Sequence, residues 1–285
     1  KTRSISVLPL CYNLLYRQMN MTLISELNRH FCSIMVGKNP FSPTWANVFN
    51  ILKRNDNECL DVDIGNWDGH WTRQLAYALT DYRLEVLRRA LVKQGKRSNR
   101  IQEYLKSYRK CMDIFYDFVV TGPFQFQDGI FRKQRGLASG CGGTANDNSE
   151  THLMLIRAFY INKAKHRGLC DLQSFLRYIK VFVYGDDLLL SVSKEIMPII
   201  MYQDFIDSYR HYGWPVTMAN KESEVAPRPI EECQFLKRSF KPDPNGTSMI
   251  LCPITLTTIE DMLSWIRASE TPREQLAINI NIALE

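Results

Sequence analysis

The stretch IKVFVYGDDLLLSV, residues 179–192, decides the fold. Two apolar, β-prone runs meet at Tyr184-Gly185-Asp186-Asp187. Such runs joined through Gly-Asp predict a β-hairpin, because glycine accepts a positive φ at a tight turn. The turn then presents two adjacent carboxylates beside a buried sheet. Neighbouring carboxylates repel each other, so a structure that keeps them together commonly holds a cation; an ordinary solvated turn is the alternative.

Length and composition predict a globular chain with a sizeable core. The chain has 285 residues, of which 45% are hydrophobic, enough for one large domain or two lobes that share a core. The net charge of +6 around an acidic hairpin favours a polyanionic partner, with plain solubility charge as the alternative. We find no apolar run of membrane-spanning length and no signal-peptide pattern. Because the chain begins at Lys1 and not at Met, we expect it to be a piece of a longer protein.

The cysteines and histidines show no metal-site spacing. The chain has 8 cysteines and no Cys-x-x-Cys pair, and its 5 histidines, at 30, 70, 152, 166 and 211, are scattered, so we expect each histidine to be structural. This pattern favours free thiols in a reducing compartment over a disulfide framework or a zinc site.

A second pair of acidic residues lies upstream. Residues 59–64 alternate as CLDVDI, which predicts a short strand with Asp61 and Asp63 on one face. Carboxylates of Asp63 and Asp186 from neighbouring strands can bracket two Mg²⁺ ions. Oxygen ligands without His or Cys partners favour Mg²⁺ or Mn²⁺ over zinc. Asp61 is either a further metal contact or the partner of a basic side chain.

The remaining pattern predicts a mixed α+β chain. A turn at 67–69 leads into a long amphipathic helix to about residue 86, and basic residues follow around 93–109, as a solvated face or a nucleic-acid contact. Residues 114–120 predict a strand, and Asp128-Gly129 a hairpin. A glycine-rich loop at 135–144 precedes a helix. Further expected elements are a helix at 194–212, a strand at 216–218, a hairpin that pairs 235–240 with 248–251, and helices at 258–265 and 272–283.

Six short motifs in this order resemble those of viral RNA-dependent RNA polymerases of the picornavirus-like group, and together they span almost the whole chain. They are Asp63-Ile64-Gly65-Asn66-Trp67-Asp68 (motif A), Ser139-Gly140-x3-Thr144-x3-Asn148-Ser149 (motif B), Tyr184-Gly185-Asp186-Asp187 (motif C), Lys221 (motif D), Phe235-Leu236-Lys237-Arg238 (motif E) and Lys1-Thr2-Arg3 (the end of motif F).

The resemblance implies an α+β polymerase palm, in which a small antiparallel, RRM-like sheet packs on helices. Residues 1–57 and 93–135 would be partial fingers, 58–92 and 136–254 the palm, and 255–285 the start of a thumb. Since the amino-terminal fingers of the family are missing, we do not expect this chain to polymerise alone.

The implied activity is template-directed RNA synthesis for replication of a positive-strand RNA virus genome. A nucleoside monophosphate passes from an NTP to an RNA 3′-hydroxyl by a two-metal mechanism, and pyrophosphate leaves. Asp63, Asp186 and Asp187 would hold the Mg²⁺ ions, for which Mn²⁺ can substitute. Lys221 would protonate the pyrophosphate as general acid.

The resemblance also implies the residues that bind nucleotide and RNA. Asp68 and Asn148 would read the ribose 2′-hydroxyl, which is both donor and acceptor. Ser139, Gly140 and Thr144 would adjust that network from the glycine-rich loop. Lys1 and Arg3 would meet the triphosphate, and Lys237 and Arg238 the primer backbone.

The implied partners are a single-stranded RNA template, a primer, NTPs, other viral replication proteins and a protein primer. The implied location is the host cell cytoplasm, at membrane-associated replication complexes. Two alternatives remain open. One is a reverse transcriptase-like polymerase, against which the Asp68 and Asn148 pair argues. The other is a catalytically silent palm that only binds RNA or a protein partner, against which the intact aspartates argue.

Overall fold

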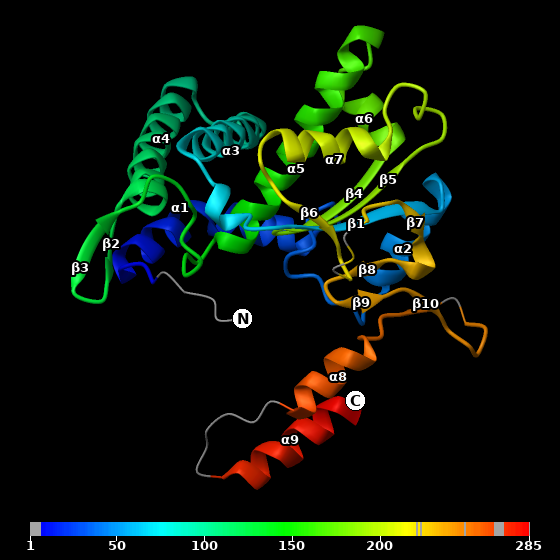
Figure 1. Ribbon diagram of the computed structural model, residues 1–285. Helices are drawn as coiled ribbons and strands as arrows, with labels where there is room; N and C mark the ends of the chain where they lie inside the picture. The colour runs from blue at the N-terminus through cyan, green and yellow to red at the C-terminus, as the bar shows by residue number, and fades with distance from the viewer. Residues whose placement is uncertain (1–6, 221, 223, 248, 265–270, 285) are drawn as a thin grey trace.

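The computed structural model describes residues 7–220, 222, 224–247, 249–264 and 271–284. An antiparallel sheet in the order β4-β5-β1-β6 forms the centre (Figure 1). Its strands are β4 (Ile179–Tyr184), β5 (Asp187–Val192), β1 (Glu58–Ile64) and β6 (Val216–Met218), and β7 (Arg228–Pro229) pairs with the start of β1. The hairpin predicted at Gly185 is therefore confirmed, and it joins β4 to β5.

Both faces of this sheet are covered, as the continuous apolar runs of β4 and β5 require. Helices α5 (Thr144–Ala164) and α7 (Tyr202–His211) cover one face, where Val62, Val183 and Leu190 join the larger core (Figure 1). Helix α2 (Pro43–Asn55) covers the other, where Phe182 and Leu189 join a second core. Since side chains alternate along a strand, the aspartates of β1 point to the α2 side.

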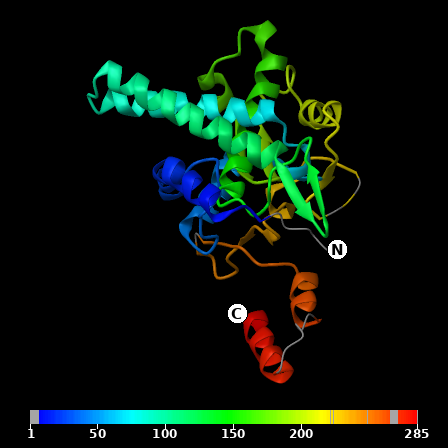
Figure 2. The same ribbon diagram turned by 90° about the vertical axis from the view of Figure 1, so that its left-hand side faces the viewer.

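A helical layer lies beside the sheet. It contains α1 (Leu10–Arg29), α3 (Arg73–Lys93) and α4 (Ser98–Thr121), with α3 packed along α4 (Figures 1 and 2). The short helix α6 (Leu172–Tyr178) leads into β4. Within the described residues no helix is both long and apolar enough to cross a membrane.

One buried cation ties this helical layer to α5. The Arg83 guanidinium in α3 is fully buried and donates to Asp147 (2.7 Å) and Glu150 (2.6 Å) of α5. The hydroxyls of Tyr16 and Tyr116 also donate to Asp147, so that α1 and α4 join the same cluster. Because every charge in the cluster is paired, it can lie in the core without an isolated ion.

Three expectations about secondary structure are wrong. Residues 114–120, expected as a strand, form the last two turns of α4, because Phe115, Val119 and Val120 fall on its buried face. The helix expected at 194–212 forms only at Tyr202–His211, after a turn at 194–199. The hairpin expected to pair 235–240 with 248–251 is two short ones, β8–β9 (Gln234–Phe235, Arg238–Ser239) and β10–β11 (Lys241–Pro242, Ile250–Leu251).

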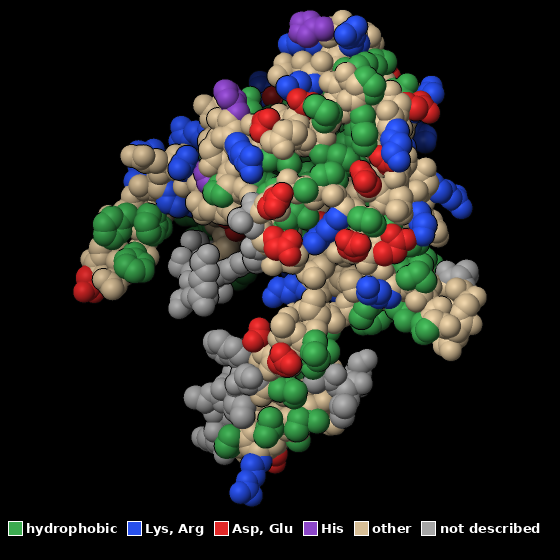
Figure 3. Space-filling view, turned by 45° about the vertical axis from the view of Figure 1, so that its right-hand side comes forward, with side chains coloured by type: hydrophobic (Ala, Val, Ile, Leu, Met, Phe, Trp, Pro, Cys, Tyr) green, Lys and Arg blue, Asp and Glu red, His purple; other side chains and the backbone are tan. Residues whose placement is uncertain are grey.

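Apolar side chains are exposed at the ends of the molecule. Hairpin β2–β3 (Pro123–Phe126, Gly129–Arg132), predicted from Asp128-Gly129, exposes Phe126 and Ile130. Helices α8 (Leu256–Ser264) and α9 (Pro272–Leu284) project from the rest of the chain and carry exposed leucines and isoleucines (Figures 1 and 3). Helix α8 begins two residues before residue 258, the start expected from the sequence.

We predict that Arg83→Met lowers the free energy of unfolding by about 3–5 kcal/mol, because Asp147 and Glu150 would keep buried charge without a partner. Urea unfolding measures this. Arg88→Met is the matched control, because Arg88 lies in the same helix in an exposed pair with Glu85, and its loss should change stability little. Equal effects of both variants would contradict the role given to the buried cluster.

Candidate metal centre and nucleotide-facing cavity

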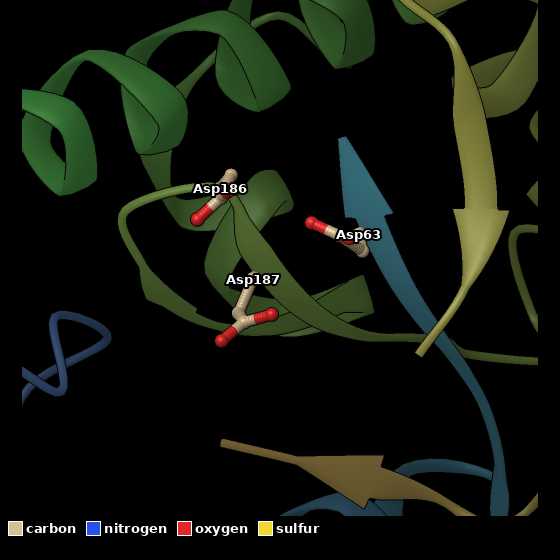
Figure 4. Close-up of side chains that lie close together, drawn as sticks. All are labelled: Asp63, Asp186 and Asp187. Carbon is tan, nitrogen blue, oxygen red and sulfur yellow. The ribbon is translucent and has the colours of Figure 1, made fainter. Parts of the chain in front are cut away.

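Strand register brings the aspartates together. Asp63 at the end of β1 lies opposite Asp187 at the start of β5, and Asp186 occupies the turn before it. A carboxylate oxygen from each of the three residues lies within 4.8 Å of the others. Figure 4 shows the Asp63 side chain pointing from β1 toward the turn that carries Asp186 and Asp187. The cluster predicted from residues 123 positions apart is therefore present in the structure.

The electrostatics of this cluster favour a cation. Burial, and then the adjacent charge of Asp186, raise the pKa of Asp187 from its ordinary value of 3.8 to about 7; the Lys237 charge opposes this. A divalent cation would remove the repulsion and would hold all three groups ionised. The donor set contains only carboxylate oxygens, which suits Mg²⁺ or Mn²⁺.

Asp61 does not belong to this cluster. It is fully buried and accepts two hydrogen bonds from the Arg228 guanidinium and one from the backbone N–H of Gln234 (2.8 Å). Of the two interpretations left open by the sequence, the structure supports a partner for a basic side chain. The Asp61–Arg228 pair therefore anchors β7 against β1.

Asp68 and Asn148 meet beside the metal cluster. The Asn148 amide nitrogen donates to Asp68 Oδ1 at 2.6 Å. A carboxylate only accepts, so this contact fixes the orientation of the amide. Asn148 Oδ1 is buried and has no hydrogen-bond partner among the described residues. An unpaired acceptor costs free energy in the absence of a donor, and a ligand hydroxyl can supply one.

The glycine-rich loop forms one wall of a cavity of about 480 Å³. The loop contributes Ser139, Gly142 and Thr144, α5 contributes Asn148, and the hairpin contributes Asp186 together with its neighbours. A second cavity, of about 940 Å³, lies against α3, α5 and α7 and is lined by none of these residues. We place the site in the smaller cavity because Asp186 and Asp187 line it.

Contacts within the chain hold the glycine-rich loop in place. The Thr144 hydroxyl lies 3.0 Å from the Ala138 carbonyl and 2.9 Å from that of Cys141, so it holds the loop itself. Gly140 pairs with Val7, and Gly142 donates to Asn13 of α1 at 2.9 Å. At Gly143 a Cβ atom would lie 1.9 Å from the Tyr16 ring, so no larger residue fits.

The predicted basic contacts divide into three groups. Lys237 is exposed at the β8–β9 turn, and its charge acts on Asp187. Arg238 is engaged within the chain, because it donates to the Cys252 carbonyl (2.8 Å) and lies over the Phe41 ring (4.7 Å). Lys1, Arg3 and Lys221 lie outside the described residues.

Sequence reasoning assigned no functional role to two residues that contact the turn at Gly185. Ser149 Oγ accepts from the Gly185 N–H at 2.8 Å, and His152 Nδ1 lies 2.8 Å from the Gly185 carbonyl. His152 was expected to be structural. The spacing of Asn148, Ser149 and His152 over one turn of a helix that leaves the glycine-rich loop is the signal that could have identified them.

Comparisons with known proteins agree with this geometry. A family model described as viral RNA-dependent RNA polymerase matches residues 1–284. The RNA1 polyprotein of Tomato ringspot virus (isolate raspberry) is 28% identical over 288 residues, which covers 100% of this chain and 12% of that protein. The RNA1 polyprotein of Cowpea mosaic virus (strain SB) is 28% identical over 246 residues, 84% of this chain and 12% of that protein. The chain thus spans about an eighth of the length of these relatives.

A solved structure supports the fold. The Sicinivirus 3Dpol RNA dependent RNA polymerase superposes with a TM-score of 0.69 at 17% identity, over 94% of this chain and 56% of that one. This likeness confirms the α+β polymerase palm expected from the motifs. With the family match over almost every residue, it follows that the chain belongs to the viral RNA-dependent RNA polymerases and is similar to those of picornavirus-like viruses.

Proposed function

We propose that this chain is the catalytic palm of an RNA-dependent RNA polymerase that replicates a positive-strand RNA virus genome. It would transfer a nucleoside monophosphate from an NTP to an RNA 3′-hydroxyl and release pyrophosphate. The observation that carries this proposal is the cluster of Asp63, Asp186 and Asp187 beside a cavity lined by Asn148. It is supported by the family match.

In this proposal Asp63, Asp186 and Asp187 hold two Mg²⁺ ions, for which Mn²⁺ can substitute. The ions would supply activation of the attacking hydroxyl and stabilisation of the leaving pyrophosphate. The raised pKa of Asp187 supports this assignment, because a cluster that resists full ionisation gains most from a cation. Lys237, exposed near the cluster, and Arg238 are the proposed primer contacts.

Ribose selection follows from the amide geometry. With its nitrogen bonded to Asp68, Asn148 offers Oδ1 as an acceptor for the hydrogen of a 2′-hydroxyl, and Asp68 can accept in the same network. A deoxyribose would leave the buried Oδ1 unpaired, which favours NTP over dNTP. Ser139 and Gly140 would shape the loop against the nucleotide, while Thr144 would keep the loop closed on itself.

Three cations complete the proposed mechanism. Lys1 and Arg3 would neutralise the triphosphate, and Lys221 would protonate the pyrophosphate.

The proposed domains follow the polymerase fold. The partial fingers would be residues 1–57 and 93–135, the palm 58–92 and 136–254, and the start of a thumb 255–285. The proposed partners are single-stranded RNA template, primer, NTPs, other viral replication proteins and a protein primer. The proposed location is the host cytoplasm, at membrane-associated replication complexes.

We predict that Asp186→Asn, in a polymerase that carries this chain, reduces NTP incorporation at least about 100-fold, because metal-assisted stabilisation amounts to several kcal/mol. Primer extension measures the loss, and RNA binding measured by fluorescence anisotropy should stay unchanged. Asp128→Asn, in the exposed β2–β3 turn, is the control and should keep full activity. Incorporation by Asp186→Asn at the wild-type rate would refute the metal assignment, whereas a wild-type protein that binds RNA without incorporating NTP would favour a silent palm.

We predict that Asn148→Ala reduces the preference for NTP over dNTP about tenfold, because the variant loses one buried hydrogen bond to the 2′-hydroxyl. The ratio of kcat/KM values for the two substrates checks this. Asn162→Ala, on the same helix outside the site, should leave the ratio unchanged. A wild-type enzyme that prefers dNTPs would support the reverse-transcriptase alternative.

We predict that Asp187 makes metal-free stability fall as pH rises. Its folded pKa of about 7 exceeds the ordinary 3.8, so its contribution is fully present below the ordinary value and is lost as pH rises through 7. Relative to Asp187→Asn, the wild type should lose on the order of 2 kcal/mol of unfolding free energy between about pH 4 and pH 8. At the higher pH, added Mg²⁺ should raise the unfolding free energy of the wild type more than that of Asp187→Asn. Parallel pH profiles would refute this coupling.

A further inference from the structure

The imidazole of His152 lies where four elements meet. It is fully buried in α5. Nδ1 lies 2.8 Å from the Gly185 carbonyl in the catalytic turn, and Nε2 lies 2.7 Å from the Tyr209 hydroxyl in α7. The Trp67 ring, just after β1, lies against the imidazole with the centroids 4.4 Å apart. The His152 side chain therefore links α5 to the turn at Gly185, to α7 and to the segment that follows β1.

The hydrogen-bond partners determine the tautomer. The Gly185 carbonyl can only accept, so His152 Nδ1 must carry the hydrogen. In the neutral ring Nε2 is then an acceptor, and the Tyr209 hydroxyl donates to it. Burial lowers the pKa of His152 to about 4, so the ring is neutral near pH 7. Both ring nitrogens are thus satisfied in a single orientation.

Gly185 is held from both sides by α5. Its N–H donates to Ser149 Oγ (2.8 Å), and its carbonyl accepts from His152. Gly185 has a φ of +62°, in the left-handed region, and a Cβ there would meet nothing within 4 Å. The two hydrogen bonds from α5 therefore hold the Gly185 peptide in addition to the pairing of Tyr184 with Asp187 across the turn.

The orientation of Gly185 determines where Asp186 points. The Gly185 carbonyl belongs to the planar peptide that joins it to Asp186, so the bond from His152 sets the tilt of that plane. On the far side, the Asp186 carbonyl accepts from the backbone N–H of Ile64 at 3.4 Å. The two peptides that flank the Asp186 Cα are thereby tied to α5 and to β1.

We propose that His152 and Ser149 are positioning residues that clamp the Gly185–Asp186 peptide, so that the Asp186 carboxylate faces Asp63 and completes the metal centre. This inference rests on the proposed function, since it concerns the same metal site. Neither side chain touches the ion or the substrate. Their loss should therefore weaken metal affinity without removing a ligand.

Two substitutions of His152 separate the clamp from simple packing. In His152→Asn the amide nitrogen takes the place of Nδ1 and can still donate to the Gly185 carbonyl, but the contact with Tyr209 is lost. In His152→Gln the amide reaches the place of Nε2 and keeps Tyr209, but the donor to Gly185 is lost. Both variants leave a cavity beside Trp67, so both should lower the unfolding temperature.

The measurement is binding of Mn²⁺ alone, without RNA or NTP, followed by electron paramagnetic resonance of free Mn²⁺. We expect His152→Gln to raise the Mn²⁺ dissociation constant about tenfold, as loss of one buried hydrogen bond would, and His152→Asn to retain wild-type affinity. In primer extension, His152→Gln should raise the Mg²⁺ concentration for half-maximal rate and recover kcat at high Mg²⁺. Equal Mn²⁺ affinity of the two variants would overturn the proposal.

Ser149→Ala tests the other half of the clamp and keeps the proposal falsifiable where a His152 variant does not fold. It removes one oxygen and should raise the Mn²⁺ dissociation constant, whereas Tyr209→Phe should lower stability only. Wild-type Mn²⁺ affinity in folded Ser149→Ala would overturn the clamp.

The variant Asp186→Asn distinguishes failure of the clamp from failure of the proposed metal site. If it binds Mn²⁺ as the wild type does, the metal assignment fails and the clamp with it. If only Asp186→Asn loses binding, the metal site stands and the clamp fails.

Discussion

The antiparallel register that places Asp63 opposite Asp187 is the constraint on which the rest of the structure depends. A slip of β1 by one residue against β5 would turn Asp63 to the opposite face of the sheet, on the side of the larger core. Burial in this register, and then the adjacent charge of Asp186, raise the pKa of Asp187, so that its ionised form opposes the arrangement. Packing on both faces of the sheet offsets this cost, because the register buries Val62 and Leu188 in the larger core and Leu189 in the second core.

Helix α5 carries this constraint to the rest of the site. Residues in the first two turns of α5 point in different directions and contact different parts of the site. Asp147 and Glu150 face the buried Arg83, Asn148 faces Asp68, and Ser149 and His152 face Gly185. A buried ion pair is weak evidence for net stability, but it penalises any rotation of the helix that would leave a charge unpaired. The Arg83 cluster therefore fixes the rotation of α5, and the rotation of α5 fixes the two contacts to the carboxylate site.

The sequence predicts this site in part, and the failures have physical causes. The hairpin at Gly185 and the strand ending at Asp63 follow from local patterns, and the motifs bring Asp68 and Asn148 together. Residues 114–120 were misassigned because a run of aromatic and β-branched residues fits a buried helix as well as a strand. The partner of Asp61 is Arg228, 167 residues away, and no local pattern reveals such a pairing. His152 was not selected because a single histidine shows no metal-ligand spacing. The role proposed for it follows only from its contact with the turn at Gly185.

The two walls of the cavity, one formed by α5 and the sheet and the other by the glycine-rich loop, are held by different interactions. The difference determines which wall a substrate could move. The wall formed by α5 and the sheet is fixed by buried charge and by both cores. The loop wall is fixed at its ends. Gly136 has a φ of +109° and donates to the Trp71 carbonyl at 2.8 Å, and Gly143 leaves no space against Tyr16. Between these points the loop is tied by Thr144, by the Gly142 bond to Asn13 and by the Gly140 pairing with Val7. Single hydrogen bonds of this kind cost less to exchange than buried ion pairs, so under the proposed function residues 137–142, and not the carboxylates or Asn148, would adjust to a nucleotide.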